Sequence, residues 1–434
     1  MKIKNIKANE ILDSRGNPTV STEIELENGI ISHASVPSGA STGIHEAHEL
    51  RDGDMKRFDG KGVLKACQNI EQIIQPEIKK IDIENQAEID SKMCELDGTK
   101  NKEKLGANAI LAVSIAALRA HAAHNGKELY EIIGELYGFH DFRLPKPLSV
   151  ILEGGKHSDS NCEIQEFMIQ IEEEKIEENL RKIELVYHSL EQVLESQGKN
   201  TNIGYEGAFG PNLTSNREGL DLIMQAIEMS GLKPRYDVRI ALDIAASEFY
   251  DTESSQYLLK SENIALRGSQ MVAYNEELAR DYPILSIEDG MYEDDWEGWQ
   301  ALYERLGDKI MLVGDDLFVT NTERIRNGID RHAANAVLIK PNQIGTVTET
   351  IEAVKMTKFA SWEPIVSHRS GETNDSFIAD LAVAISAKYI KAGAPARGER
   401  VAKYNRLMEI SSVIPAPDRV EGKASAGIQE DNSK

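Results

Sequence analysis

The chain has 434 residues and a formal net charge of −23, with 41% hydrophobic and 28% charged residues. This balance is ordinary for a globular protein of two or three domains, or of one barrel with a smaller unit. Because the chain shows no basic stripe, we expect neither nucleic acid nor a membrane surface as its partner. A small anionic substrate would need local positive charge or a bound metal to attract it.

The N-terminal stretch "MKIKNIKANEILDSRG" lacks the apolar core of a secretory signal. The three cysteines, Cys67, Cys94 and Cys162, are odd in number and show no metal-binding spacing, which favours a reducing cytoplasm. The most apolar long stretch, "ANAILAVSIAALRAHAAH", is too short and too polar for a membrane span. Its alanine content predicts a buried helix instead, so we expect a cytoplasmic protein without membrane insertion.

Residues 18 to 37 predict a β-hairpin. Apolar and polar residues alternate from Val20 to Leu26, and Asn28-Gly29 then supplies a tight turn before a second apolar run. The following stretch, "PSGASTG", is rich in glycine and serine and is predicted to be mobile.

From about residue 60 to 135 the pattern becomes helical. The segment "GVLKACQNIEQII" is predicted to place Val63, Ala66, Ile70, Ile73 and Ile74 on one face of a helix. Residues 1–135 are therefore expected to form a small α+β domain. The proline-containing stretch "FHDFRLPKPLSV" predicts the boundary to the next domain.

The remainder of the chain repeats a strand followed by a helix. Repeated units of this kind predict a parallel sheet, and their number favours a (β/α)₈ barrel over residues 143–412, with an open doubly wound sheet as the alternative. Each apolar strand ends in a polar or charged residue, and the predicted strand ends are Asp243, Glu288, Asp315, Lys340, His368 and Lys391. In a barrel these ends meet at one mouth, whereas an open sheet would scatter them along a line.

Three of these strand ends are acids: Asp243, Glu288 and Asp315. A single acid at such a position is more often the N-cap of the next helix. Three carboxylates at one mouth repel one another unless a cation lies among them, and hard oxygen ligands suit Mg²⁺. The pattern therefore predicts a divalent-metal site.

Lys340 ends the apolar run "AVLIK", and a lysine beside a metal and a second lysine, Lys391, is predicted to have a lowered pKa and to act as a base. Pro341 biases Lys340 toward an extended backbone, so Lys340 can belong to the strand. At the next strand end, "SHRSGET" supplies residues 368–370, a histidine, an arginine and a serine that suit an anion.

The motifs "DSRGNPTV", "PSGASTG", "IQEFMIQ", "LDIAASEFY", "SIEDG", "GDDLFVTN", "KPNQIG", "SHRSGET" and "RVAKYNR" together resemble the enolase family, from about residue 3 to about 410. This resemblance implies an α/β fold with an N-terminal α+β capping domain and a TIM-like barrel whose elements follow the order ββαα(βα)₆. It implies reversible Mg²⁺-dependent dehydration of 2-phosphoglycerate to phosphoenolpyruvate in glycolysis and gluconeogenesis. It also implies two Mg²⁺ per site, the second arriving with substrate, and a homodimer or octamer. The segment 413–434 is expected to be a disordered tail.

The resemblance also implies roles for individual residues. Lys340 matches the base that removes the C2 proton, Glu206 matches the general acid for the C3 hydroxyl, and Glu166 matches the acid that supports it. Asp243, Glu288 and Asp315 match ligands of the first Mg²⁺, and Ser41 matches the loop serine that binds substrate and the second Mg²⁺. His157, in the matching mobile loop "GGKHSDSN", is expected both to take part in catalysis and to bind substrate, and so is Glu166. The other positions that match substrate contacts are His368, Arg369, Ser370 and Lys391.

Two departures from the family pattern lie near the general acid. Tyr205 stands where enolases usually have Asp, and Glu153 stands where they usually have Asn. One interpretation is that Glu153 replaces the missing charge, and the other is that residue 205 points away from the site.

Two other readings of the chain's function remain. One is a lyase or racemase of the same superfamily that acts on a non-phosphorylated acid, and the other is a non-catalytic binding protein.

Overall fold

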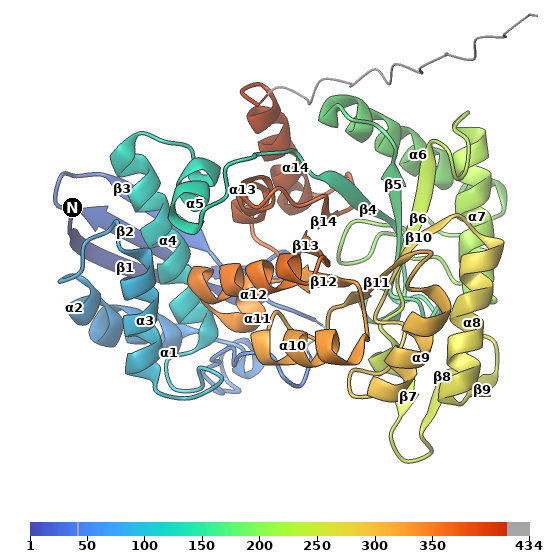
Figure 1. Ribbon diagram of the computed structural model, residues 1–434, viewed down its shortest axis with the longest axis horizontal. Coiled ribbons are helices and arrows are strands. Elements are labelled where there is room, and N and C mark those ends of the chain that lie inside the picture. Colours follow the sequence, from blue (N-terminus) through green and yellow to red (C-terminus); the bar gives the residue numbers. More distant parts are fainter. Residues whose placement is uncertain (41–42, 415–434) are drawn as a thin grey trace, which may run out of the picture.

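The structure is a computed structural model that describes residues 1–40 and 43–414. Its strands form a three-stranded sheet, a closed eight-stranded barrel and a second three-stranded sheet. Figure 1 shows the first sheet and helices α1–α4 at one end of the molecule and the barrel with its surrounding helices at the other. Ser41 and most of the expected tail, residues 415–434, lie outside the described residues.

The N-terminal part consists of an antiparallel sheet and a helical layer. Its strands are β1 (Ile3–Leu12), β2 (Pro18–Leu26) and β3 (Ile31–Ser35). Its helical segments are η1 (Phe58–Gly60), α1 (Leu64–Asn69), η2 (Ile70–Ile74), α2 (Gln75–Ile78), α3 (Gln86–Asp97), α4 (Ala107–Asn125) and α5 (Leu129–Tyr137). The predicted hairpin is confirmed, because β2 and β3 pair antiparallel on either side of Gly29, whose φ is 85°.

The predicted helical face is correct except at Ile73. Val63, Ala66, Ile70 and Ile74 are fully buried, whereas Ile73 is 36% exposed. The chain forms a π-helical turn over η2, and its wider turn rotates Ile73 away from the face that an α-helix would give it. The predicted buried helix is confirmed as α4, which packs between the small sheet and α11–α12.

The barrel strands are β4 (Lys146–Glu153), β5 (Glu166–Ile171), β6 (Val238–Asp243), β10 (Ile284–Glu288), β11 (Met311–Gly314), β12 (Ala336–Ile339), β13 (Glu363–Ser367) and β14 (Tyr389–Gly393). The helices are α6 (Ile176–Ser196), α7 (Asn216–Met229), α8 (Gly268–Asp281), α9 (Trp296–Leu306), α10 (Thr322–Arg331), α11 (Pro341–Ile344), α12 (Val347–Phe359), α13 (Phe377–Ala384) and α14 (Gly398–Ser411). Short 3₁₀ segments, η3 (Gly155–His157) and η4 (Ala246–Phe249), follow β4 and β6.

The order of these elements confirms the predicted ββαα(βα)₆ barrel. Strand β5 runs antiparallel to both β4 and β6, and the other barrel strands pair in parallel. Because the sheet closes on itself, the open doubly wound alternative is excluded. The long interval between Asp243 and Glu288 holds the second small sheet, β7 (Tyr250–Asp251), β8 (Gln256–Leu259) and β9 (Ile264–Leu266).

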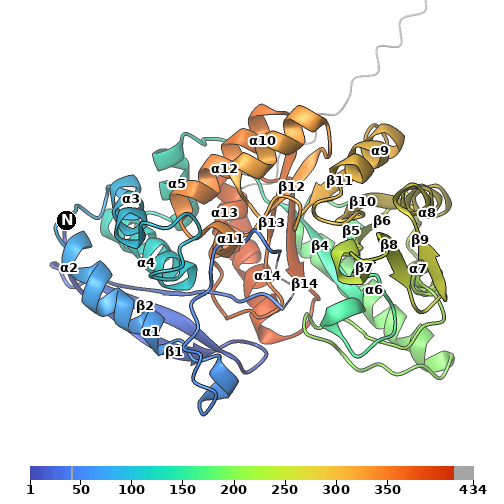
Figure 2. The same cartoon turned by 90° about the horizontal axis from the view of Figure 1, so that it is seen from below.

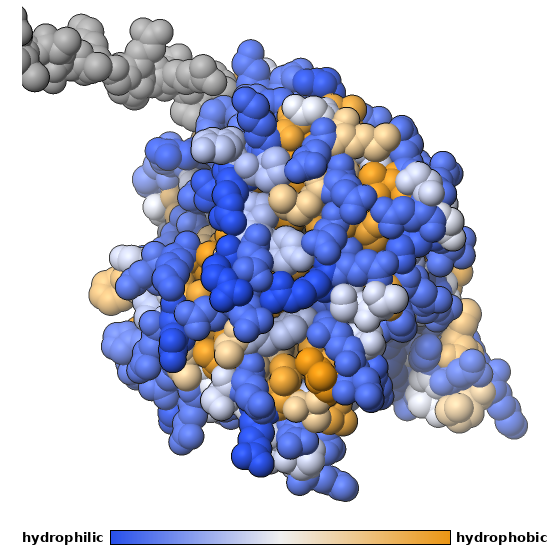
Figure 3. Space-filling model, turned by 90° about the vertical axis from the view of Figure 1, so that its right-hand side faces the viewer, coloured by the Kyte–Doolittle hydropathy of each residue, from blue (hydrophilic) through white to orange (hydrophobic). Residues whose placement is uncertain are grey.

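The outer helices turn their apolar residues to the barrel. In α7, for example, Leu220 and Ile223 are buried. Figure 3 shows the side of the molecule that faces right in Figure 1, where hydrophilic side chains predominate and hydrophobic ones form small separate groups. Among the described residues no helix is long and apolar enough to cross a membrane.

The segment after β3 joins the N-terminal part to the barrel, and Figure 2 shows this chain reaching toward the barrel strands. Ser38 and Gly371 exchange two backbone hydrogen bonds of 2.8 and 2.9 Å. The part of "PSGASTG" around Ser38 is therefore paired with the loop after β13. This contact places the N-terminal segment at the mouth of the barrel, where the site residues lie.

Candidate active site

The barrel brings the predicted strand-end residues to one mouth. Asp243 and Glu288 are the last residues of β6 and β10, and these two strands are neighbours with Asp243 opposite Glu288. Asp315, Lys340 and His368 directly follow β11, β12 and β13. Lys391 differs from the prediction, because β14 continues beyond it to Gly393.

Glu166 reaches the same mouth for a different reason. It is the first residue of β5, and β5 runs against its neighbours, so its start lies beside their carboxyl ends. In register, Glu166 stands opposite Asp243 on β6 and opposite Glu153 on β4. The antiparallel strand therefore adds a buried carboxylate to the mouth.

The ammonium group of Lys391 lies among three of these carboxylates. Its Nζ is 3.0 Å from Glu166 Oε2, 3.2 Å from Asp243 Oδ2 and 2.9 Å from Glu288 Oε1. All four residues are buried. Burial opposes the charged form of Lys391, but the carboxylates outweigh it and raise its pKa well above 10.5. For Glu288, burial and repulsion by Asp243 raise the pKa well above its usual value.

Lys340 forms an ion pair with Asp315 Oδ2. Burial again opposes the charged form of the lysine, but Asp315 outweighs burial and the pKa of Lys340 is raised above 10.5. The fall in pKa that the sequence predicted is therefore not produced by the protein groups alone. Lys391 and Arg369 do act in the predicted direction, because their positive charges lower the pKa of Lys340.

A second cluster lies around His157 in η3. Its Nδ1 is 3.4 Å from Glu166 Oε1 and 3.5 Å from Glu206 Oε1. Burial and repulsion by Glu206 raise the pKa of Glu166 well above its usual value, so this pair of carboxyl groups tends to hold a proton. Burial lowers the pKa of His157, which favours its neutral ring.

His368 lies beside Glu206, but its Nε2 and Glu206 Oε2 do not have the geometry of a hydrogen bond. Its Nδ1 lies 2.6 Å from Arg400 Nη1, and an arginine can only donate, so the ring proton belongs on Nε2. That Nε2 is 3.1 Å from Glu206 Oε2. Burial lowers the pKa of His368 to about 3, so the ring is neutral at ordinary pH. Burial would raise the pKa of Glu206, but its neighbours His368 and His157 outweigh burial and lower that pKa well below the usual value. The proton of the Glu166–Glu206 pair therefore lies on Glu166, whose pKa is raised.

At one corner of the mouth, Arg369 supplies a positive charge and Ser370 supplies a hydroxyl group. The Arg369 guanidinium makes a bidentate pair with Glu46, with both N–O distances 3.0 Å. The Ser370 hydroxyl accepts the backbone N–H of Ala40 at 2.7 Å. Arg400, which is fully buried, donates to the carbonyls of residues 369 and 370 at 2.6 and 2.7 Å and so fixes this loop.

Asp243, Glu288 and Asp315 fit a divalent cation. They offer only oxygen donors, they come from three neighbouring strands, and two of them already converge on the single nitrogen of Lys391. Hard oxygen donors of this kind are the ligands that Mg²⁺ prefers. Among the described residues, the ligand atoms that lie within 4.8 Å of one another form two other groups, Asp289–Asp315–Asp316 and His157–Glu166–Glu206, so only Asp315 of the predicted three belongs to such a group.

Sequence reasoning missed several residues of the mouth. Asp289 accepts the backbone N–H groups of Asp315 at 3.0 Å and of Asp316 at 2.8 Å, so it holds the loop that carries the predicted ligand. Asp289 is the second acid of "SIEDG" and Asp316 is the second acid of "GDDLF", so the doubled acids were a sequence signal for both residues. Glu46 and Arg400 gave no comparable local signal.

The two departures from the family pattern occupy different environments. Glu153 is fully buried and accepts the backbone N–H groups of Glu206 at 3.2 Å and of Ala208 at 3.0 Å. Glu153 therefore supports the loop that carries Glu206. Tyr205 is 42% exposed, which agrees with the alternative that its side chain points away from the site.

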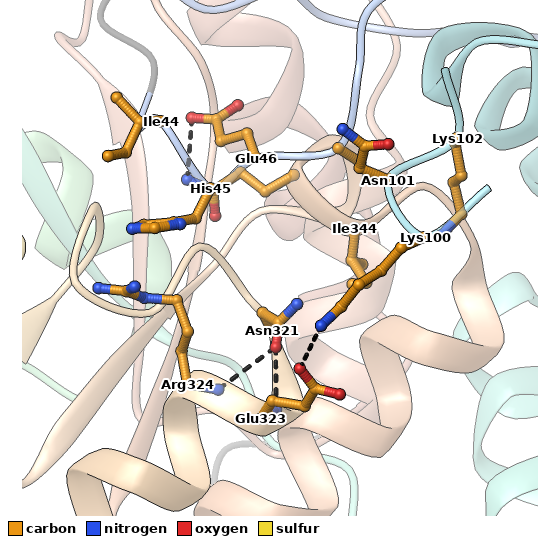
Figure 4. A pocket seen from close by; sticks show the side chains of 12 residues that line it. Ile44, His45, Glu46, Lys100, Asn101, Lys102, Asn321, Glu323, Arg324 and Ile344 are labelled. Carbon is orange, nitrogen blue, oxygen red and sulfur yellow. Dashed lines mark hydrogen bonds and ion pairs between the residues drawn. The ribbon is translucent and has the colours of Figure 1, made fainter. Parts of the chain in front are cut away.

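The cavity at the mouth is small, about 20 Å³, which is room for roughly one water molecule. Lys340 and Lys391 line this cavity together with the carboxylates. A larger cavity of about 520 Å³ lies outside the mouth, where Ile44 and His45 face Lys100, Asn321 and Arg324 (Figure 4). Its Lys100–Glu323 pair is exposed, so the buried mouth, where charges converge, is the better candidate for chemistry.

Two protein-family models match the chain. Residues 3–133 match the N-terminal domain of enolase, and residues 141–427 match the C-terminal TIM barrel domain of enolase. The two matches lie in the same order as the small sheet and the barrel in the structure. Since they span nearly the whole sequence and agree with the barrel's antiparallel second strand, this chain belongs to the enolase family.

Proposed function

We propose that this protein catalyses the reversible Mg²⁺-dependent dehydration of 2-phosphoglycerate to phosphoenolpyruvate. The observation that carries the proposal is one buried mouth in which Lys340, the Glu166–Glu206 pair and the Arg369–Ser370 corner all line the same cavity. These are a base, an acid and an anion-binding corner for one substrate. Family membership supports an enzyme of the enolase superfamily that acts on a small molecule.

The first step of this reaction is removal of the C2 proton by Lys340, whose amine must be neutral to act as a base. Asp315 raises the pKa of Lys340, and a cation held by Asp315 would offset that effect. The electron pair of the broken C–H bond then becomes negative charge shared with the substrate carboxylate. Lys391, whose positive charge the surrounding acids maintain, opposes that charge. A cation held by Asp243, Glu288 and Asp315 would supply Lewis-acid stabilisation of the same charge.

The second step is loss of the C3 hydroxyl group. The proton that the Glu166–Glu206 pair holds is passed through Glu206 to that oxygen, the C3–O bond breaks, and the electron pair left at C2 forms the C2–C3 double bond. Water leaves, so atoms and charge balance. The Glu166 carboxyl, whose pKa is raised, supports Glu206 through their shared neighbour His157. Arg369 and Ser370 hold the phosphate, since arginine binds phosphate oxygens in a bidentate manner.

The same proposal includes the remaining expectations from the sequence. Ser41 contributes to substrate and second-metal binding, the chain forms a homodimer or an octamer, and it acts in the cytoplasm in glycolysis and gluconeogenesis. Sedimentation of the purified chain tests the oligomer independently of the activity.

The deciding experiment is an assay of phosphoenolpyruvate formation from 2-phosphoglycerate by the purified chain. We expect turnover with Mg²⁺, none after exhaustive EDTA treatment and gel filtration, and recovery when Mg²⁺ is added back. Unphosphorylated glycerate is the matched substrate control. Turnover of a non-phosphorylated acid but not of 2-phosphoglycerate would favour the lyase or racemase reading, and Mg²⁺ binding without turnover of either would favour the non-catalytic one.

A further inference from the structure

We propose that Gln343 is a positioning residue that couples the metal-binding carboxylate Asp315 to the anion-binding Arg369 through Glu46. This inference rests on the proposed function, because it assigns a role toward the proposed metal and phosphate. Gln343 lies in α11, three residues after Lys340, and is only 1% exposed.

The side-chain amide of Gln343 has a polar partner on each side. Its Nε2 donates to Asp315 Oδ1 at 2.9 Å and to Glu46 Oε1 at 3.3 Å. Its Oε1 accepts from the Thr320 hydroxyl at 2.9 Å. A single buried amide therefore joins the end of β11, the segment after residue 43 and the turn before α10.

The orientation of this amide is determined by Thr320. The Thr320 hydroxyl accepts the backbone N–H of Lys340 at 2.9 Å, so its own proton must go to another acceptor. Gln343 Oε1 at 2.9 Å is nearer than the Leu338 carbonyl at 3.4 Å. The amide oxygen therefore faces Thr320, and the NH₂ group faces the two carboxylates.

The backbone around Thr320 is held in an unfavourable conformation. Val319 and Thr320 have φ values of 44° and 54°, in the left-handed region that β-branched residues rarely adopt. Both are fully buried. Strain of this kind persists only where the surroundings enforce it, and here it directs the Thr320 hydroxyl toward Lys340 and Gln343.

Gln343 fixes one oxygen of Asp315 while Lys340 contacts the other. On its other side it contacts Glu46, which pairs with Arg369 and also accepts the backbone N–H of Gly43 at 3.1 Å. The backbone carbonyl of Gln343 accepts the N–H of Ala47 at 2.8 Å, which holds the same segment a second time. A displacement of the Asp315 carboxylate is thereby transmitted to the Arg369 guanidinium, and a displacement of that guanidinium is transmitted to the carboxylate.

The test compares Gln343→Met with a matched control, Gln170→Met. Methionine fills the same space without the amide. Gln170 is another fully buried glutamine of the barrel, and its amide nitrogen contacts a backbone carbonyl, that of Ile171. Calorimetry without 2-phosphoglycerate measures Mg²⁺ binding, and then inorganic phosphate binding with and without Mg²⁺.

In the unmodified chain we expect Mg²⁺ to strengthen phosphate binding, because the two sites are coupled. Gln343→Met should weaken Mg²⁺ binding by about tenfold, as expected for loss of a residue that orients a metal ligand, and should abolish the coupling. Gln170→Met should leave both unchanged. Equal Mg²⁺ affinity in Gln343→Met and the unmodified chain overturns the inference, and so does an equal loss in Gln170→Met.

If Gln343→Met does not fold, Thr320→Val takes its place, since it removes the hydroxyl that orients the amide. That hydroxyl also accepts the Lys340 N–H, so Mg²⁺ and phosphate binding are compared, and not turnover. We expect a weaker loss of Mg²⁺ affinity in the same direction, and affinity equal to that of the unmodified chain overturns the inference. Failure of the proposed function is seen separately. In that case the unmodified chain binds Mg²⁺ and the variants weaken it, but no chain dehydrates 2-phosphoglycerate.

Discussion

Two regions of this protein contain buried ion pairs. In one region the positive and negative groups are paired one to one, and in the other the negative groups are in excess. Between the N-terminal part and the barrel, Arg119 of α4 makes a bidentate pair with Asp375, with distances of 2.6 and 2.7 Å. Asp375 also accepts the backbone N–H groups of Ser35 and Phe377. Burial would raise the pKa of Asp375, but Arg119 outweighs it and holds the pKa below 3.8.

At the barrel mouth, carboxylates outnumber the cations. Lys391 alone faces Glu166, Asp243 and Glu288, and the pKa of Glu288 is raised by burial and by the repulsion of Asp243. A one-to-one pair with complete hydrogen bonding stabilises a fold, whereas crowded carboxylates favour a cation or a proton. Changes at the mouth should therefore affect the reaction, and a change at the interface should affect stability.

The largest effect on the reaction is expected from Lys340→Ala. Without the amine, exchange of the C2 proton of 2-phosphoglycerate with deuterated water should fall by about 10⁴-fold, the upper range for loss of a general base. Nuclear magnetic resonance of the substrate measures the exchange. Lys388→Ala, which changes an exposed lysine just before β14, is the control and should exchange normally. Exchange retained in Lys340→Ala would show that another group is the base.

Glu206→Gln should have the next largest effect and should separate the two steps. The amide keeps the shape of the carboxyl group but cannot give a proton to the C3 oxygen. We expect dehydration to fall by about 10²- to 10³-fold while C2 exchange stays measurable. Glu195→Gln, on the exposed side of α6, is the matched control. Parallel loss of both activities would contradict the assignment of Glu206 as the acid.

Asp375→Asn should lower stability with little change in kcat/KM. The loss should be roughly 2–3 kcal/mol, below the roughly 3–5 kcal/mol of a fully enclosed pair because Arg119 is 22% exposed. Urea unfolding measures it, with the exposed Asp330→Asn as control. Since the pKa of Asp375 is lowered by folding, its contribution is present above about pH 4 and is lost as the pH falls through the folded-state value. If the free energy of unfolding of Asp375→Asn still differed from that of the unmodified chain below that pH, the ion pair would be excluded as the cause.

Tyr205→Asp should have the smallest effect. Because the Tyr205 side chain is 42% exposed, the new carboxylate would be solvated, and kcat/KM should change by no more than about twofold. In a double-mutant cycle with Glu153→Asn, the effects on kcat/KM should add, since Glu153 is buried under the loop of Glu206. Strong coupling between positions 153 and 205 would instead support charge compensation.

The residue types at the strand ends and the order of the elements could be predicted from the sequence. Hydrophobic periodicity and turn residues are local signals, and they predicted the hairpin at Gly29, the buried helix α4 and the barrel strands that end beside Asp243, Glu288 and Lys340. Family motifs added the antiparallel β5, which periodicity alone did not show.

How these residues face one another could not be predicted from the sequence and depends on the folded chain. The π-helical turn exposes Ile73, the ion pair with Asp315 raises the pKa of Lys340 instead of lowering it, and the Gln343 amide joins Asp315 to Glu46. Electrostatic and hydrogen-bond energies depend on distances of a few ångströms between groups far apart in the chain. No local pattern contains those distances, because closure of the barrel sets them.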